Sequence, residues 1–192
     1  MISSNLMTLY GKASGDTIEE GKQWYQIAHE HAEEIAWTWN IIVPDAVAVI
    51  ALLSPGVTWS TNIKDANNLI GMWRSGGQSA VVNTRISTYG QFKHRAYLVL
   101  EGIDEFQETP TNKKTWAFYN NILNPHKDAY VTIDRHAYKA LVGAKYSGGV
   151  RISRKRYEAA ARAYRDTAEH IGLKAHQLQA IIWLQYKLDN GV

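Results

Sequence analysis

The chain has 192 residues, 45% of them apolar, and a formal net charge of +3, which is typical of a soluble globular domain and argues against disorder. It contains no cysteine, which excludes disulfides, iron–sulfur clusters and thiolate zinc sites. No apolar run approaches the roughly 20 residues that span a bilayer, and the N-terminus does not have the pattern of a signal peptide. We therefore expect a cytoplasmic protein that does not bind membranes.

Helical periodicity covers the first half of the sequence. Residues 17–39 have the apolar spacing of a long amphipathic helix, and residues 45–53, which follow Pro44, are apolar on every side, as in a central buried helix. A third helix is expected at 58–73, ended by the glycines at 76 and 77, with shorter helices at 79–86 and 91–100.

The second half continues the helical pattern. Helices are predicted at 114–123, from Asp134 to 141, at 153–171 and at 174–188. Residues 131–133 have a strand-like composition but are too short and isolated to indicate a sheet. We predict one all-α domain over residues 1–192, in which an acidic N-terminal helical segment, 1–44, packs on a core formed by 45–192.

Charge is distributed unevenly along the chain. Residues 1–45 carry two lysines against seven acidic residues, whereas residues 135–165 carry nine basic residues against Glu158 alone. The nine are Arg135, Lys139, Lys145, Arg151, Arg154, Lys155, Arg156, Arg162 and Arg165. This concentration indicates a surface that faces phosphates, although a solvated helix face has the same composition.

Lys114 and Asp134 are the residues best suited to chemistry. A deprotonated lysine can form a Schiff base with a sugar, and an ionised carboxylate can stabilise the cation that develops when a base leaves deoxyribose. The alternative is structural, with Lys114 as a solvated residue in the first turn of a helix and Asp134 as the N-cap of the helix beginning at Arg135.

Four segments occur in an order that resembles the helix-hairpin-helix superfamily of DNA glycosylases, the fold of endonuclease III. They are residues 48–62 (AVIALLSPGVTWSTN), 89–96 (YGQFKHRA), 109–117 (TPTNKKTWA) and 131–136 (VTIDRH). The resemblance implies an all-α, single-domain helical bundle of the helix-hairpin-helix DNA glycosylase type, without an iron–sulfur cluster. It aligns Lys114 and Thr115 with the family's Lys-Thr pair, Asp134 with the catalytic aspartate and His136 with the histidine.

The hairpin segment departs from the family pattern. The family reads Leu-Pro-Gly-Val-Gly-Arg-Lys-Thr-Ala, whereas this chain has Thr111-Asn112-Lys113 in place of the glycines and is one residue shorter. Glycine lets backbone N–H groups approach a phosphate closely, so the usual phosphate contact is in doubt. The charge of Lys113 could compensate.

The chain is also similar to small phage-encoded proteins of unassigned function. The shared segments are Leu53-Ser54-Pro55 with Trp59 and Asn62, then residues 114–122, and then residues 131–137. Related glycosylase-like folds are thought to occur among phage enzymes that attach amino acids or amines to an activated thymine in DNA. This resemblance keeps the fold but offers a different reaction.

Further candidates for contacts with DNA or substrate are polar, basic or aromatic residues of these segments and of the basic stretch. They are Ser54, Trp59, Asn62, Lys113, Arg135, His136, Arg154, Lys155 and Arg156. Trp59 would stack on a base or pack in the core, Ser54 would line the pocket or end the buried helix, and His136 would contact substrate or hold the helix start.

The leading hypothesis is a DNA N-glycosylase, with or without lyase activity, that excises a modified or damaged base flipped out of DNA. The alternatives are a phage base-hypermodification transferase and a non-catalytic DNA-binding protein. DNA is the expected partner, with no obligatory protein partner, no cofactor and no metal, and a phage protein would act in the host cytoplasm. The sequence around His29, Glu30 and His31 offers no third ligand on one helix face.

Overall fold

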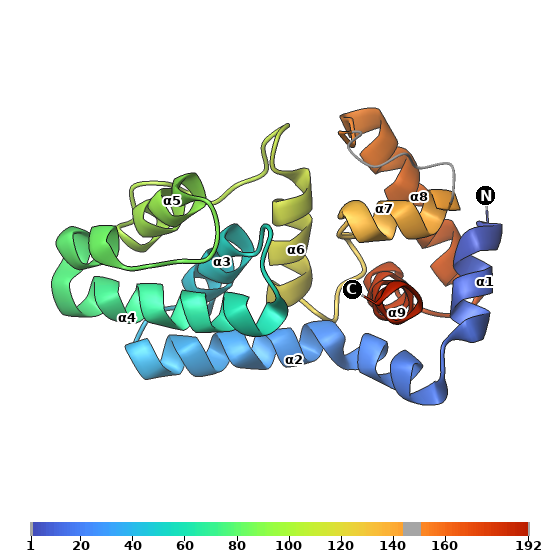
Figure 1. Cartoon of the computed structure of the whole chain (residues 1–192), viewed down its shortest axis with the longest axis horizontal. Coiled ribbons are helices and arrows are strands. Elements are labelled where there is room, and N and C mark those ends of the chain that lie inside the picture. The colour runs from blue at the N-terminus through green and yellow to red at the C-terminus, as the bar shows by residue number, and fades with distance from the viewer. Residues whose placement is uncertain (1, 144–150, 192) are drawn as a thin grey trace. The chain divides into compact units, whose positions relative to one another are not determined.

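The computed structural model describes residues 2–143 and 151–191, and in these ranges the regular structure is entirely α-helical (Figure 1). The helices described are α1 (Ser4–Lys12), α2 (Gly15–Trp39), α3 (Val43–Leu53), α4 (Trp59–Asn83), α5 (Gly90–Leu100), α6 (Lys113–Leu123), α7 (Arg135–Val142), α8 (Arg154–His170) and α9 (Ala175–Asn190). The predicted all-α class is confirmed. Lys145, counted among the basic residues above, lies outside the described ranges.

Helix α1 was not predicted, whereas the break within α4 was. The pattern did not indicate α1, because in nine residues it buries only Leu6; its start is marked instead by the Ser3 hydroxyl, which accepts a hydrogen bond from the Leu6 N–H. The predicted helices at 58–73 and 79–86 correspond to the two helical parts of α4, which are separated by a kink at Gly77, where φ is 57°. The predicted break at the glycines is therefore confirmed.

The contacts between residues group the chain into two compact units. Unit 1 comprises Met1–Ile27 and Asn124–Val192, and unit 2 comprises Ala28–Leu123. Helix α2 supplies its first half to unit 1 and its second half to unit 2. The predicted single domain with a division at residue 44 remains a prediction.

In unit 1, helices α1, α7 and α8 pack against α9 (Figure 1). The core lies among these helices and is rich in alanine, which lets the backbones approach closely, with Tyr164 as its largest fully buried side chain. The segment before α7 also enters this core, because Val131 and Ile133 are 2% and 1% exposed. The strand-like composition of 131–133 therefore reflects burial of a loop.

In unit 2, α3 is the central helix. All eight residues from Ala46 to Leu53 are buried, and α4, α5 and α6 each pack against α3. The side-chain amide of Asn62 on α4 donates a hydrogen bond of 2.9 Å to the carbonyl oxygen of Ile50. The predicted central buried helix is confirmed.

The second half of α2 is attached to α4 near Trp39. The indole N–H of Trp39 donates to Asn67 Oδ1 at 2.8 Å, and the guanidinium of Arg74 donates to the carbonyl oxygens of Trp39 and Asn40. Gly71 lies against the Trp39 ring, and a Cβ at that position would be 2.7 Å from it. Glycine is therefore required for this close approach.

Among the described residues, no single helix has the length and apolar character to cross a membrane, and α2 with α3, which are sharply bent relative to each other, form one pair that meets the test on length and composition only.

Candidate functional site

The predicted site residues are divided between the two units. Unit 2 contains Ser54, Trp59, Asn62, Lys113 and Lys114, and unit 1 contains Asp134, Arg135, His136, Arg154, Lys155 and Arg156. Lys114 thus lies in unit 2 and Asp134 in unit 1. That the two side chains face one cleft remains a prediction.

Asp134 is the N-cap of α7. Its Oδ1 accepts a hydrogen bond of 2.7 Å from the Ala137 N–H, so the carboxylate stabilises the start of the helix. The prediction that Asp134 is the N-cap of the helix beginning at Arg135 is confirmed. The side chain is half-buried, and no hydrogen bond among the described residues uses its Oδ2. Oδ1 therefore caps the helix, whereas Oδ2 can accept a hydrogen bond from a ligand or stabilise its charge.

Two tyrosines of α8 hold the start of α7 in place. The Tyr157 hydroxyl donates to the Val131 carbonyl oxygen at 2.7 Å and accepts from the Ile133 N–H at 3.4 Å. The Tyr164 hydroxyl donates to the Ala137 carbonyl oxygen at 2.9 Å, and burial, followed by the charge of Asp134, raises the pKa of Tyr164 well above its usual value. Both sides of Asp134 are thereby fixed to α8. No local sequence signal indicates these contacts, because they join residues about 25 positions apart.

The first turn of α8 is strongly basic. Arg154, Lys155 and Arg156 occupy it, all three are exposed, and the helix has no acidic residue there. Cations at a helix N-terminus are disfavoured by the helix dipole, whereas an anion bound there would be stabilised. We call these three residues the α8 cationic turn. Arg154 also contacts Glu158 at 2.9 Å, an exposed pair of little energetic value.

Arg135 and His136 begin α7 immediately after Asp134. Arg135 is exposed. The His136 ring is half-buried with its centroid 5.9 Å from that of Tyr186, and its buried Nδ1 has no hydrogen-bond partner within the described part of the chain. His136 thus packs on α9 and also has a ring nitrogen without a partner among the described residues. The packing fits a role in holding the helix start, and the ring nitrogen fits a contact with substrate.

Lys113 and Lys114 form the first turn of α6. Both are half-buried, and Lys113 Nζ lies 3.8 Å from Glu108 Oε1. Thr115, which follows, is buried. Like the α8 cationic turn, this helix start lacks an acidic residue and places cations where the dipole favours anions.

Ser54, Trp59 and Asn62 each have structural contacts in unit 2. The Ser54 hydroxyl donates to Ala51 O at 2.9 Å at the end of α3, and Asn62 is 1% exposed. Trp59 is the first residue of α4, and its ring packs in a tilted contact with His31 and an edge contact with Phe118. These contacts give each of the three residues a structural role. That they contact DNA remains a prediction.

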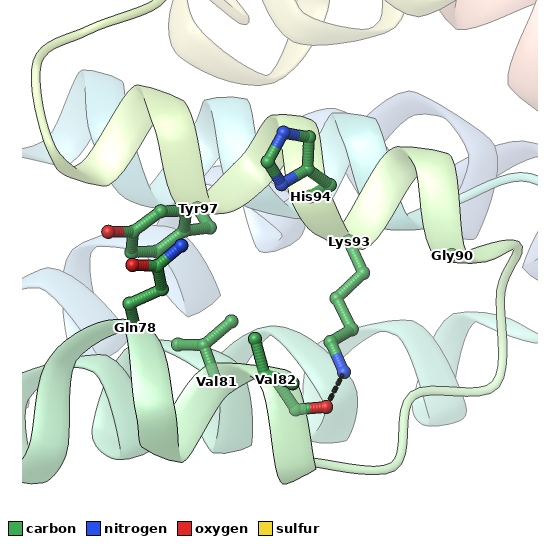
Figure 2. A pocket seen from close by; sticks show the side chains of 7 residues that line it. All are labelled: Gln78, Val81, Val82, Gly90, Lys93, His94 and Tyr97. Atoms are coloured by element: carbon green, nitrogen blue, oxygen red, sulfur yellow. Dashed lines mark hydrogen bonds between the residues drawn. The ribbon is translucent and has the colours of Figure 1, made fainter.

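A pocket between α4 and α5 was not predicted (Figure 2). It measures about 230 Å³ and is lined by Gln78, Val81, Val82, Gly90, Lys93, His94 and Tyr97. It lies beyond the break at Gly77, so the pocket wall is the part of α4 that the sequence analysis assigned to a separate short helix. The adjacent glycines at 76 and 77 were the signal of a local bend.

Unit 1 also buries a polar cluster at the start of α9. His176 is 2% exposed, its Nδ1 lies 3.8 Å from Asp128 Oδ1, and its ring meets that of Tyr25 edge-on. Burial lowers the pKa of His176 from its usual value more than Asp128 raises it. The Tyr25 hydroxyl in turn donates to Gln179 at 2.7 Å. The cluster is enclosed, which favours a structural role.

Within the described ranges, no group of three or more histidine, cysteine, aspartate or glutamate residues could hold a metal ion. Near the sequence cluster considered above, His29 Nε2 lies 3.5 Å from Glu33, while its Nδ1 is 2.9 Å from the Ile122 carbonyl oxygen. His29 thus joins α2 to the end of α6.

The sequence matches a family model over residues 1–189, and the chain belongs to this family, described as a family of unknown function (DUF7178). No curated protein and no solved structure matches the chain.

Proposed function

We propose that this protein binds DNA through the α8 cationic turn and excises a base from it as a DNA N-glycosylase. The observation that carries the proposal is that α8 holds the segment before Asp134. Tyr157 bonds to the backbone at Val131 and Ile133, and Arg154 lies one helical turn before Tyr157 in α8. The carboxylate and the cationic turn thus belong to elements of unit 1 that are joined by hydrogen bonds.

The chemistry follows from the two charges. Basic side chains would bind the DNA backbone, and a base flipped from the duplex would bring its sugar to the carboxylate. Departure of the base develops positive charge on the sugar, which the ionised Asp134 would stabilise through Oδ2, since Oδ1 accepts the capping bond from Ala137. The base would leave with the electrons of the C1′–N bond and take up a proton, and water would add to C1′ of the sugar. If strand cleavage follows, the amine of Lys114 would add to C1′ in place of water and form the Schiff base. The ordered resemblance of the sequence segments supports this assignment.

A second candidate is a DNA-binding protein without catalytic activity. The observation that favours it is the capping bond itself, because an N-cap aspartate has a sufficient structural reason to be present. In this case the α8 cationic turn would still bind DNA.

The test uses duplex and single-stranded oligonucleotides that carry a panel of modified and damaged bases. Released bases are measured by mass spectrometry, and covalent intermediates are trapped with borohydride. We expect base release by the wild-type protein and at least a hundredfold slower release by Asp134→Asn, which keeps an N-cap side chain while removing the charge. Loss of the trapped complex in Lys114→Ala would identify the Schiff-base lysine.

The matched control is Asp134→Ala, which removes both the charge and the cap. We expect it to be less stable than Asp134→Asn by about 1 kcal/mol, measured by urea denaturation. Base release by Asp134→Asn at the wild-type rate would contradict the proposal. A base that gains mass and stays in the DNA would support the transferase instead, and DNA binding without reaction on any substrate would support the second candidate.

A further inference from the structure

The pocket between α4 and α5 has the size and lining of a small binding site. Its volume of about 230 Å³ lies below the roughly 300–1,000 Å³ typical of sites for drug-sized ligands, so it suits a single planar ring. Val81 and Val82 of α4 form an apolar floor, and side chains of α5 stand opposite them (Figure 2). The pocket lies entirely within unit 2.

One end of the pocket is formed by Gln78 and Tyr97, which approach each other from α4 and α5 (Figure 2). Tyr97 lies one helical turn after Lys93 on α5. Its ring forms an aromatic wall at this end of the pocket. No hydrogen bond among the described residues uses the Gln78 amide, which offers both a donor and an acceptor to a ligand.

The other end is cationic. Lys93 extends from α5 across the pocket, and its Nζ donates to the carbonyl oxygen of Val82 at 2.8 Å (Figure 2). It also donates to the carbonyl oxygen of Thr84 at 2.7 Å. These carbonyls end α4, so Lys93 caps that helix and is fixed in position. An ammonium group has three donors, and two are used here, which leaves one for a ligand oxygen. No carboxylate is among the residues that line the pocket.

We propose that this pocket binds a planar heterocycle that carries ring carbonyl oxygens, of the class of thymine and uracil. One carbonyl oxygen would accept from Lys93, the adjacent imide edge would pair with the donor and acceptor of Gln78, and the ring would lie between the valines and Tyr97. A base without a carbonyl oxygen, such as adenine, would leave the third Lys93 donor unused. The inference rests on the proposed function in one respect, which is that the heterocycle is taken to be a base of DNA.

The test is a titration of the ¹⁵N-labelled full chain with thymidine, followed by amide chemical shifts. We expect shifts centred on residues 78–97 and binding about five- to tenfold weaker for deoxyadenosine. Val82→Trp should fill the pocket, and Gln78→Leu should remove the edge contact, each weakening thymidine binding by about the same factor. Val82 is 65% exposed and Gln78 is exposed, so both variants are expected to fold, which circular dichroism checks.

Gln23→Leu is the matched control, because Gln23 is an exposed glutamine on α2 that does not line the pocket. The inference is overturned if thymidine leaves residues 78–97 unshifted at millimolar concentration, if deoxyadenosine binds equally well, or if Val82→Trp binds thymidine as the wild type does. If the protein binds thymidine but releases no base from any oligonucleotide, the glycosylase proposal is refuted and the pocket proposal is supported. If the protein releases a base, does not bind thymidine and is unaffected by Val82→Trp, the pocket proposal is refuted and the glycosylase proposal is supported.

Discussion

The hydroxyl of Tyr157 donates a hydrogen bond of 2.7 Å to the carbonyl oxygen of Val131, three residues before Asp134. Val131 is 2% exposed, so this carbonyl is poorly accessible to water that could replace the tyrosine. The loop that leads to α7 therefore depends on α8 for its hydrogen bonding as well as for its packing.

Replacing Tyr157 by phenylalanine should destabilise the protein by about 1–3 kcal/mol, because it leaves the Val131 carbonyl oxygen unsatisfied. The measurement is urea denaturation followed by circular dichroism. Tyr89→Phe is the control, since Tyr89 is 67% exposed and should change stability by less than about 0.5 kcal/mol. Equal stability of the two variants would show that the Tyr157 hydroxyl does not support the loop.

Replacing Arg154, Lys155 and Arg156 together by glutamine should weaken DNA binding and reduce its dependence on salt. If all three contact phosphates of a duplex, the slope of log affinity against log salt should fall by about 2.7. The helix itself should become more stable at low salt, because three cations are removed from its positive end. Fluorescence anisotropy with a labelled duplex measures the first effect and thermal unfolding the second.

The control for this triple variant is a set of three exposed basic residues elsewhere, Lys12, Lys64 and Arg85, also changed to glutamine. It alters net charge equally and should leave most of the affinity and of the salt slope intact. Similar losses in both variants would mean that DNA responds only to net charge, and the α8 cationic turn would then have no special part in binding.

His176 should make the stability of the protein depend on pH. Because burial lowers the pKa of His176 in the folded protein, the unfolded chain takes up its proton first, near the ordinary value of 6.5. The stabilisation is complete above that pH and is lost as pH falls toward the folded value, by at most about 1.4 kcal/mol per pH unit. His176→Gln should remove this component.

The measurement compares urea midpoints of the wild type and His176→Gln from pH 7.5 to 5. The two proteins differ only at position 176, so the difference between the two curves reports the contribution of the histidine. A difference that stays constant over this range would contradict a depressed His176 pKa.

Gly21 of α2 faces the backbone of α9. A Cβ at position 21 would lie 2.7 Å from both the Cα and the backbone nitrogen of Ile181, so Gly21→Ala should destabilise the protein by about 1–3 kcal/mol. Gly11→Ala in α1 is the matched control, since no atom lies within 4 Å of its Cβ position and the change should stabilise by roughly 0.5–1 kcal/mol. Thermal unfolding of both variants tests the contrast, and similar effects would refute the close α2–α9 contact.

The helices were largely predictable because their signals are local. Pro44, the apolar run to Leu53, and the Asp134 cap each act within one or two helical turns. The short helix α1 was not found, since its one buried residue, Leu6, leaves no periodicity to detect. The break within α4 was predicted because the adjacent glycines at 76 and 77 are a local signal.

The candidate site was predictable only as a list of residue types. The sequence could suggest Asp134 and the basic stretch, but the contacts of Tyr157 and Tyr164 that hold them together in unit 1 depend on tertiary packing. The α4–α5 pocket was missed for the same reason, because Gln78 and Lys93 are ordinary surface residues until two helices are placed side by side. The shared role proposed for Lys114 and Asp134 rests on chemistry and on order in the chain.

The order of the units along the chain has a consequence for how the protein is made. Unit 2 is one continuous stretch, Ala28–Leu123, whereas unit 1 needs both Met1–Ile27 and residues that follow Asn124. A ribosome therefore synthesises all of unit 2 before it synthesises α7, α8 and α9. Until α9 is synthesised, the first half of α2 has no partner for the face that contains Gly21. Gly21 allows the close contact with Ile181 of α9, but before α9 is present this glycine only weakens the helix.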